Sequence, residues 1–117
     1  MRVYGLKKCS TCKKATDWLS DNGVNHEFID YRDNPIEPHH LKIWAEALGG
    51  WEKLVNRASM TWRKLAEHER EVYTDEQWQS LIAQYPSLVK RPLVVLPDGT
   101  VTAGFSEKRF KEVLDKS

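Results

Sequence analysis

Two cysteines near the start of the chain are the residues best suited to chemistry. Cys9 and Cys12 are separated by Ser10 and Thr11. A disulfide that closes so short a loop adds little folding stability, because the stabilisation grows with loop length. The Cys-x-x-Cys spacing instead indicates redox chemistry or half of a metal site. Zinc needs about four ligands, and the sequence has no second Cys-x-x-Cys and no histidines at a recognisable zinc spacing. We therefore expect redox chemistry and no metal.

The positions of the two thiols predict different roles. A cysteine attacks as its thiolate, so a reactive cysteine needs surroundings that stabilise negative charge. Cys9 comes just before the first turn of a predicted helix, where free backbone N–H groups and the positive helix end favour a thiolate. Positive potential is added by four flanking lysines, Lys7, Lys8, Lys13 and Lys14. Cys12 falls on the apolar face of that helix and should be more buried. The sequence therefore predicts that Cys9 attacks and Cys12 resolves the mixed disulfide.

The elements around the cysteines predict a β-α-β unit. Residues 2–5 predict a short opening strand that ends at a glycine. The helix that follows has an apolar face formed by Cys12, Ala15, Thr16 and Leu19. Residues 27–31 predict a second, half-buried strand. Such a unit makes two parallel strands joined by a right-handed crossover.

The rest of the chain predicts helices, then a hairpin and a closing helix. Residues 36–89 carry apolar side chains at helical spacing, which predicts an all-helical insertion. Residues 93–104 predict two strands joined by a turn. Ser106 caps the last helix, and Phe105 with Phe110 fits a hydrophobic staple. The order of elements predicts an α/β fold with a mixed four-stranded sheet.

The composition limits the classes of function. A length of 117 residues suits one domain, 1–117, and 40% hydrophobic with 30% charged residues is ordinary for a globular protein. The net charge of +1 argues against a large nucleic-acid surface, which needs a clear basic excess. No apolar run approaches the roughly 18 residues that span a bilayer, and the N-terminus lacks a signal-peptide pattern. We therefore expect a cytoplasmic protein without direct nucleic-acid or membrane partners.

These features together resemble the ArsC family, which includes arsenate reductases. The resemblance covers nearly the whole chain and rests on the Cys9 loop, the helical middle and the segment Lys90-Arg91-Pro92-Leu93-Val94-Val95. Five further motifs are similar to the YffB-like branch of that family: Asp30-Tyr31-Arg32, Gly50-Trp51-Glu52, Leu54-Val55-Asn56, Thr61-Trp62-Arg63-Lys64-Leu65 and Gly104-Phe105-Ser106. The resemblance implies a thioredoxin-like fold over about residues 1–35 and 90–117, with the helical insertion at about residues 36–89.

The resemblance also implies roles for single residues. Cys9 matches the cysteine with which arsenate reductases form a thiol–arsenate adduct, later released by glutathione and glutaredoxin. Arg91 matches an arginine that binds the oxyanion, and Pro92 matches the cis-proline that faces the cysteine. The residues taken alone predict only a surface arginine and a proline that opens a strand. The implied substrate or anion site is completed by Ser10, by Thr11 and by a position for a family arginine that falls nearest Asn56 or Arg57.

Two positions differ from the pattern of arsenate reductases. Gly5 stands where those enzymes carry a histidine, and Phe105 stands where they carry an arginine. Each charge-assisted hydrogen bond lost around an oxyanion costs roughly 1.5–3 kcal/mol. Reduction of a thiol-linked substrate therefore fits the residues better than reduction of arsenate. We expect a glutathione-linked thiol oxidoreductase with no bound cofactor, recycled by glutathione or by a glutaredoxin- or thioredoxin-type protein.

A second branch of the family supplies an alternative function. Spx proteins also carry a Cys-x-x-Cys near the N-terminus, and they act as redox-switched regulators that bind the RNA polymerase α-subunit. In that interpretation a Cys9–Cys12 disulfide is a switch and not a catalytic intermediate. The motifs at residues 30–32 and 61–65 favour the YffB-like branch, so the regulator ranks second. A metal chaperone that uses both cysteines and a histidine ranks third.

Overall fold

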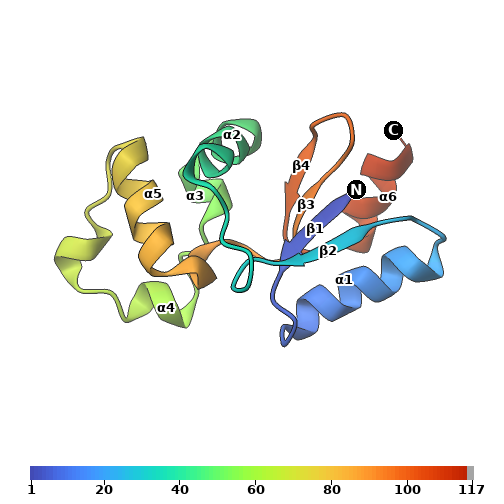
Figure 1. Cartoon of the computed structure of the whole chain (residues 1–117), viewed down its shortest axis with the longest axis horizontal. Helices are drawn as coiled ribbons and strands as arrows, with labels where there is room; N and C mark the ends of the chain where they lie inside the picture. The colour runs from blue at the N-terminus through green and yellow to red at the C-terminus, as the bar shows by residue number, and fades with distance from the viewer. Residues whose placement is uncertain (116–117) are drawn as a thin grey trace. The chain divides into compact units, whose positions relative to one another are not determined.

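The computed structural model describes the backbone of residues 1–115 and the side chains of residues 1–112. The chain divides into two compact units (Figure 1). The first, which we call the sheet unit, is formed by Met1–Tyr31 and Arg91–Ser117. The second, the helical unit, is formed by Arg32–Lys90. Among residues 1–115, no helix has both the length and the apolar content that crossing a membrane would need.

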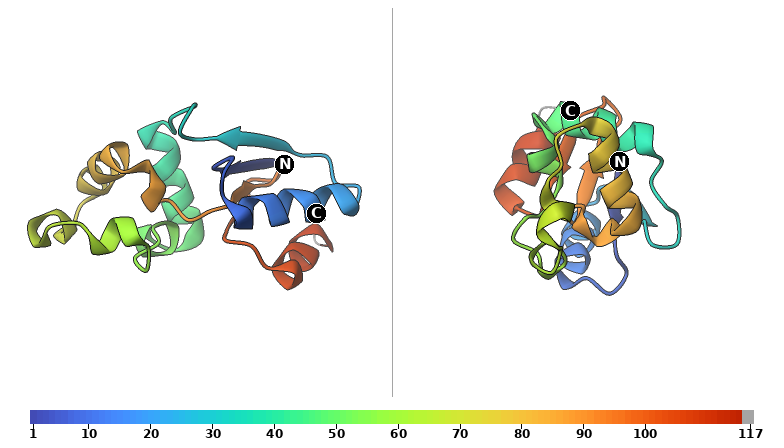
Figure 2. Two further views of the ribbon diagram at one scale, coloured as in Figure 1. Left: turned by 90° about the horizontal axis from the view of Figure 1, so that it is seen from below. Right: turned by 90° about the vertical axis from the view of Figure 1, so that its left-hand side faces the viewer.

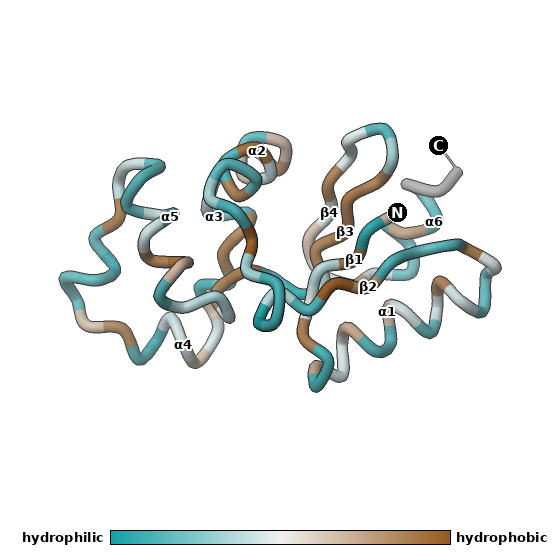
Figure 3. The backbone as a smooth tube through the Cα atoms, in the orientation of Figure 1, coloured by the Kyte–Doolittle hydropathy of each residue, from teal (hydrophilic) through white to brown (hydrophobic). Residues whose placement is uncertain are grey.

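The sheet unit contains a mixed four-stranded sheet in the order β2-β1-β3-β4. Strand β1 pairs in parallel with β2, whereas the pairs β1–β3 and β3–β4 are antiparallel. Its elements in chain order are β1 (Arg2–Gly5), α1 (Ser10–Asp21), β2 (Glu27–Asp30), β3 (Leu93–Val95), β4 (Val101–Ala103) and α6 (Glu107–Asp115). The predicted α/β fold with a mixed four-stranded sheet is thus confirmed. In Figure 3 strand β3 is coloured as hydrophobic, as a central strand should be.

Helices α1 and α6 pack against the same face of this sheet (Figure 2). Trp18 of α1 meets Phe110 of α6 edge to face, with ring centroids 5.6 Å apart. The buried core between helices and sheet consists of Val3, Ala15, Leu19, Val94, Leu96 and Phe110. Burying a large apolar side chain completely stabilises a fold by about 1.5–3 kcal/mol. This core fixes α1 against β1 and so fixes the start of α1, where the cysteines lie.

The ends of the two helices follow the local sequence. Helix α1 is followed by Gly23, whose φ of 68° lies in the left-handed region that glycine adopts without strain. Before α6, the Arg109 backbone N–H donates to Ser106 Oγ at 3.4 Å, as the predicted cap requires. The rings of Phe105 and Phe110 lie 5.1 Å apart at 90°, which confirms the hydrophobic staple.

The helical unit is built from short helices. They are α2 (Pro38–Leu48), α3 (Trp51–Leu54), α4 (Met60–Arg63), the 3₁₀ turn η1 (Glu67–Arg70), α5 (Asp75–Gln84) and the 3₁₀ turn η2 (Pro86–Leu88). Thr74 and Gln77 exchange the two hydrogen bonds of a capping box at the start of α5, at 3.0 and 3.2 Å. Three tryptophan rings from different helices stack near-parallel, with centroids about 6 Å apart: Trp51, Trp78 and Trp62.

Candidate redox site

Cys9 is the N-cap residue of α1, at the end of a four-residue loop from β1. The loop is closed by the Cys9 backbone N–H, which donates to the Leu6 carbonyl at 3.1 Å. The helix begins with the Lys13 N–H, which donates to the Cys9 carbonyl at 3.1 Å. The Cys9 side chain is half-buried at this N-cap position. The sulfur is therefore held at the start of a helix while it stays available for reaction.

The surroundings of Cys9 stabilise its thiolate. Burial alone would raise the pKa of Cys9. This effect is outweighed by hydrogen bonds that the Cys12 backbone N–H, the Cys12 thiol and the Thr11 N–H donate to the sulfur, and by the positive charge of Arg91. The pKa of Cys9 therefore lies below its usual value of 9.0. These two N–H groups belong to the first turn of α1, where the backbone has no partner of its own. The structure thus places Cys9 in the setting expected of an attacking thiol.

Cys12 has the opposite environment. Its side chain is 1% exposed, on the face of α1 that carries Ala15 and Leu19. Burial, together with the neighbouring Cys9, raises the pKa of Cys12 to about 11, although a Leu6 backbone hydrogen bond and the Arg91 charge oppose the rise. Cys12 therefore keeps its proton at neutral pH and donates it in a hydrogen bond to Cys9. No disulfide joins Cys9 and Cys12 in this structure.

Gly5, at the end of β1, makes room for the buried thiol. A Cβ atom on residue 5 would lie 2.5 Å from Cys12 Sγ and 3.3 Å from Phe28 Cε2. The first distance is far shorter than any ordinary contact between these atoms, so the Cys12 side chain would have to move. The sulfur of Cys12 thus fills the volume that any side chain on residue 5, a histidine included, would need.

A tyrosine–arginine pair supplies the positive charge near the cysteines. Tyr31 is 1% exposed. Its hydroxyl accepts a hydrogen bond from the Arg91 guanidinium, and burial raises the pKa of Tyr31 to about 12 although the Arg91 charge opposes this. Burial would lower the pKa of Arg91, but Tyr31 and the two cysteines outweigh it and raise that pKa, so the guanidinium stays charged. Arg91 precedes Pro92 through a cis peptide bond, and Pro92 is buried.

A buried carboxylate anchors the loop that carries Cys9. Asp30 is 8% exposed and accepts a hydrogen bond from the Lys7 backbone N–H at 3.0 Å. The Tyr31 N–H donates to the Gly5 carbonyl at 3.1 Å, which extends the β1–β2 pairing to the start of the loop. Sequence reasoning gave neither Asp30 nor Tyr31 a role in the site. One signal was available: parallel strands end at the same sheet edge, so residues that end β2 lie beside those that follow β1.

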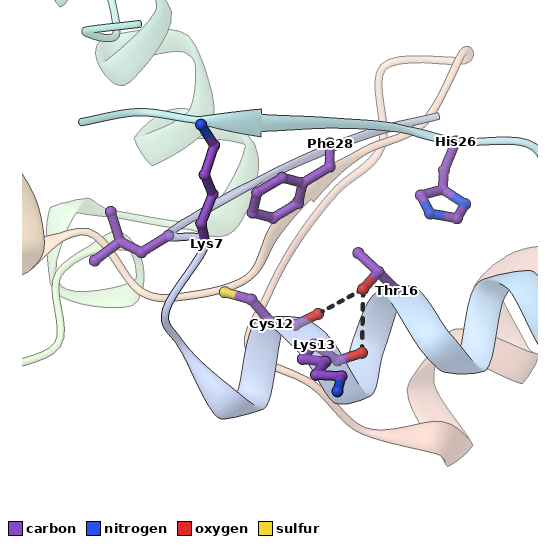
Figure 4. A pocket seen from close by; sticks show the side chains of 7 residues that line it. Lys7, Cys12, Lys13, Thr16, His26 and Phe28 are labelled. Carbon is purple, nitrogen blue, oxygen red and sulfur yellow. Dashed lines mark hydrogen bonds between the residues drawn. The ribbon is translucent and has the colours of Figure 1, made fainter. Parts of the chain in front are cut away.

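A pocket of about 320 Å³ opens beside Cys12, between α1 and β2 (Figure 4). Figure 4 shows the Cys12 sulfur and the ring of Phe28 pointing toward this space. The Thr16 hydroxyl is directed back to the helix, within 3.2 Å of the Cys12 carbonyl and 3.1 Å of the Lys13 carbonyl. The lining residues are Leu6, Lys7, Cys12, Lys13, Thr16, His26 and Phe28. Part of a substrate bound at the cysteines could occupy this space.

The residues predicted for the site fall into two groups. Cys9, Cys12 and Arg91 come together in the sheet unit, and Thr11 joins them through its backbone N–H. Ser10 begins α1 with an exposed side chain, Pro92 opens the segment that leads into β3, and the contribution of both to binding stays a prediction. Arg57 is exposed and lies between α3 and α4, in the helical unit. Its contribution to anion binding stays a prediction.

Comparisons with known proteins agree with the resemblance seen in the sequence. The family model described as "ArsC family" matches residues 4–113. An uncharacterised protein of Haemophilus influenzae is 40% identical over 109 residues, which are 93% of this chain and 94% of that protein. The global transcriptional regulator Spx of Streptococcus agalactiae is 29% identical over 92% of this chain and 78% of its own length. A solved structure of a protein named YFFB matches with a TM-score of 0.88 and 35% identity, over 97% of each chain.

Proposed function

Given that this chain belongs to the ArsC family, we propose that it is a thiol–disulfide oxidoreductase in which Cys9 attacks and Cys12 resolves. The observation that carries the proposal is the difference between the two thiols. The pKa of Cys9 is lowered by the start of α1 and by Arg91, whereas burial raises the pKa of Cys12 to about 11. A nucleophile that ionises beside a protonated partner is what a two-thiol reductase requires.

The proposed reaction transfers two electrons from the two thiols to a disulfide substrate. The Cys9 thiolate attacks one sulfur of the substrate, forms a mixed disulfide and releases the other sulfur as a thiolate. Cys12 gives up its proton, which the departing thiolate can take, and then attacks Cys9 Sγ. The substrate's second sulfur leaves as a thiolate, and a Cys9–Cys12 disulfide remains. The substrate is reduced and the enzyme is oxidised by two electrons.

The oxidised enzyme needs a reductant, and glutathione is the one we propose. Two glutathione molecules return the dithiol and become glutathione disulfide, which balances the cycle. A glutaredoxin- or thioredoxin-type protein could supply the same two electrons. The proposal includes a cytoplasmic location, where thiols are kept reduced. It includes no bound cofactor.

Serine variants of the two cysteines test this assignment. We expect Cys9→Ser to abolish reduction of a small disulfide substrate. The assay measures this reduction as NADPH consumption in the presence of glutathione and glutathione reductase. Cys12→Ser should retain turnover at a lower rate, because glutathione can then resolve the mixed disulfide directly. A mixed disulfide trapped on Cys9 in the Cys12→Ser variant should be visible by mass spectrometry. Normal turnover by Cys9→Ser would refute the assignment.

Arsenate is a less favoured substrate of the same site. Arg91 offers one positive group beside Cys9. The space over residue 5 is filled by the Cys12 thiol, so this chain has no room there for a further side chain that would bind an anion. We expect no arsenate-dependent consumption of NADPH when glutathione and glutaredoxin are supplied. Turnover of arsenate that is lost in both Cys9→Ser and Arg91→Gln would show that Arg91 suffices for oxyanion binding.

A redox-switched regulator is the second candidate, because the relatives include Spx proteins. In this function the Cys9–Cys12 disulfide would change binding to the RNA polymerase α-subunit. Capture of that subunit from purified components by the oxidised protein, but not by Cys12→Ser under the same conditions, would support the regulator. Failure of both redox states to bind the subunit would leave the oxidoreductase as the better account.

A further inference from the structure

Three side chains at the start of α2 form a cluster of metal-binding type. Glu37, His39 and His40 each offer one ligand atom, and these atoms all lie within 4.8 Å of one another. Glu37 Oε2 lies 3.3 Å from His39 Nδ1, and the rings of His39 and His40 have centroids 4.2 Å apart. The cluster belongs to the helical unit and contains none of the residues of the redox site.

The local structure turns these side chains toward one another. Glu37 is the N-cap residue of α2, yet its carboxylate makes no capping hydrogen bond and lies beside His39 instead. The ring of His40 stacks on the buried Trp44, with centroids 5.8 Å apart and planes at 12°. The backbone of the turn is held in place, because Gln79 Nε2 of α5 donates to the Pro38 carbonyl at 2.9 Å. At least one imidazole is therefore held in place before any ligand arrives.

The distances and the donor types suit a small divalent ion. Zinc binds imidazole nitrogen and carboxylate oxygen at about 2.0–2.2 Å, so two ligands of a tetrahedral zinc lie about 3.3 Å apart. The Glu37–His39 separation of 3.3 Å has that value. The side chains of His39 and Glu37 are 64% and 66% exposed, so small rotations can close the remaining distances. Two imidazoles and one carboxylate are also the donor set of zinc sites that leave a fourth position open.

We propose that Glu37, His39 and His40 form a surface site for a first-row divalent transition ion, with zinc as the preferred metal and water in the fourth position. The sequence alone predicts no metal, because the spacings of its histidines fit no four-ligand zinc motif. The structure adds a carboxylate two residues before the histidine pair. The site is independent of the proposed redox function, and failure of one does not affect the other.

The test is titration with zinc of a full-length variant that carries Cys9→Ser and Cys12→Ser, since thiolates would otherwise bind the metal. We expect calorimetry to detect one zinc per chain and thermal unfolding to move to higher temperature with added zinc. His39→Ala and His40→Ala in this background should each weaken zinc binding by about tenfold or more. Loss of a residue that only hydrogen-bonds to a metal ligand already lowers metal affinity by about that factor. His68→Ala, which removes an exposed histidine of the same unit, is the matched control and should bind zinc normally.

Each result decides for or against the site. Absence of saturable binding in the thiol-free protein would mean that Glu37 and His39 form an ion pair only, and would overturn the proposal. Binding that survives both His39→Ala and His40→Ala, or that is lost in His68→Ala, would place the metal elsewhere and would also overturn it. Circular dichroism of each variant shows whether it is folded. Cobalt used in place of zinc should give visible absorption bands that disappear in His40→Ala.

Discussion

Single residues set the chemistry of this site through the contrast between two thiols. Cys9 lies where the first-turn N–H groups of α1 can stabilise a thiolate, whereas Cys12 is almost completely buried. Desolvation disfavours the charged form of an acid, so burial separates the pKa values of two chemically identical groups. The Cys9 thiol therefore ionises more readily than the Cys12 thiol, as the proposed roles of attacking and resolving cysteine require.

The reactivity of the two thiols should differ accordingly. We expect iodoacetamide to alkylate Cys9 first, with a rate that titrates below the ordinary thiol pKa of 9.0. The pKa of Cys12 is raised to about 11, so its alkylation should be slow at neutral pH. Mass spectrometry of peptides across a pH series would measure both rates. In the control variant Cys12→Ala, Cys9 loses the donated thiol hydrogen bond and its pKa should rise. Equal rates for the two cysteines would contradict this account.

The buried Cys12 should also make the reduced protein less stable in alkaline solution. Because the folded state raises the pKa of Cys12 from 9.0 to about 11, the folded state holds this proton more tightly than the unfolded state. The resulting contribution is fully present below pH 9.0 and is lost as the pH rises through about 11. We expect a loss of about 1–2 kcal/mol of unfolding free energy over this range. Urea unfolding of the wild type and Cys12→Ser, both with reductant, should show a larger loss in the wild type, because the raised pKa of Tyr31 contributes a loss of the same sign to both proteins.

Gly5 and Cys12 should behave as a coupled pair. A methyl group on residue 5 would lie 2.5 Å from Cys12 Sγ, so Gly5→Ala should destabilise the protein by about 1–3 kcal/mol. The displaced sulfur should also form the Cys9–Cys12 disulfide less readily in glutathione buffers. Adding Cys12→Ala removes the sulfur and should recover part of the stability, which a double-mutant cycle measures as a coupling energy. Additive effects of the two changes would show that the contact has no energetic importance.

At the scale of elements, the pairing of β1 with β2 holds the loop that presents Cys9. The Asp30 carboxylate at the end of β2 is buried and accepts the Lys7 N–H. Asp30→Ala leaves that N–H without its acceptor, at a cost of about 1–3 kcal/mol. We expect faster hydrogen exchange at the Lys7 amide and slower alkylation of Cys9. Asp30→Asn keeps an acceptor oxygen and serves as the control. Unchanged exchange at Lys7 in Asp30→Ala would remove the anchoring role.

The elements themselves could be predicted because their signals are local. The helix that follows the cysteines has a clear apolar face, and the staple of Phe105 and Phe110 needs only residues close in sequence. The packing of Asp30 and Tyr31 next to the cysteine loop depends on which strands pair, and apolar periodicity does not report that. The clash that a side chain on Gly5 would create with Cys12 likewise arises from packing across the β1–α1 interface. These contacts required coordinates.

At the scale of the whole molecule, both cysteines and the groups that shift their pKa values lie in one of the two units. Besides the cysteines themselves, the groups that shift their pKa values are Leu6, Thr11 and Arg91, and all three lie in the sheet unit. An oxidoreductase needs no more than this, because its substrate and reductant both react at Cys9. A redox-switched regulator needs more, since oxidation must change a surface that a partner recognises.

Amide NMR spectra of the reduced and oxidised protein distinguish these two functions. For an oxidoreductase we expect the shifts caused by the Cys9–Cys12 disulfide to concentrate in β1, the start of α1 and the segment around Arg91. The amides of α5 should keep their positions, because α5 belongs to the helical unit, whereas the cysteines and the groups that shift their pKa values belong to the sheet unit. Cys12→Ser, treated with the same oxidant, controls for effects that do not need the disulfide. Large disulfide-dependent shifts throughout α5 would mean that oxidation changes the helical unit as well, and would favour the regulator.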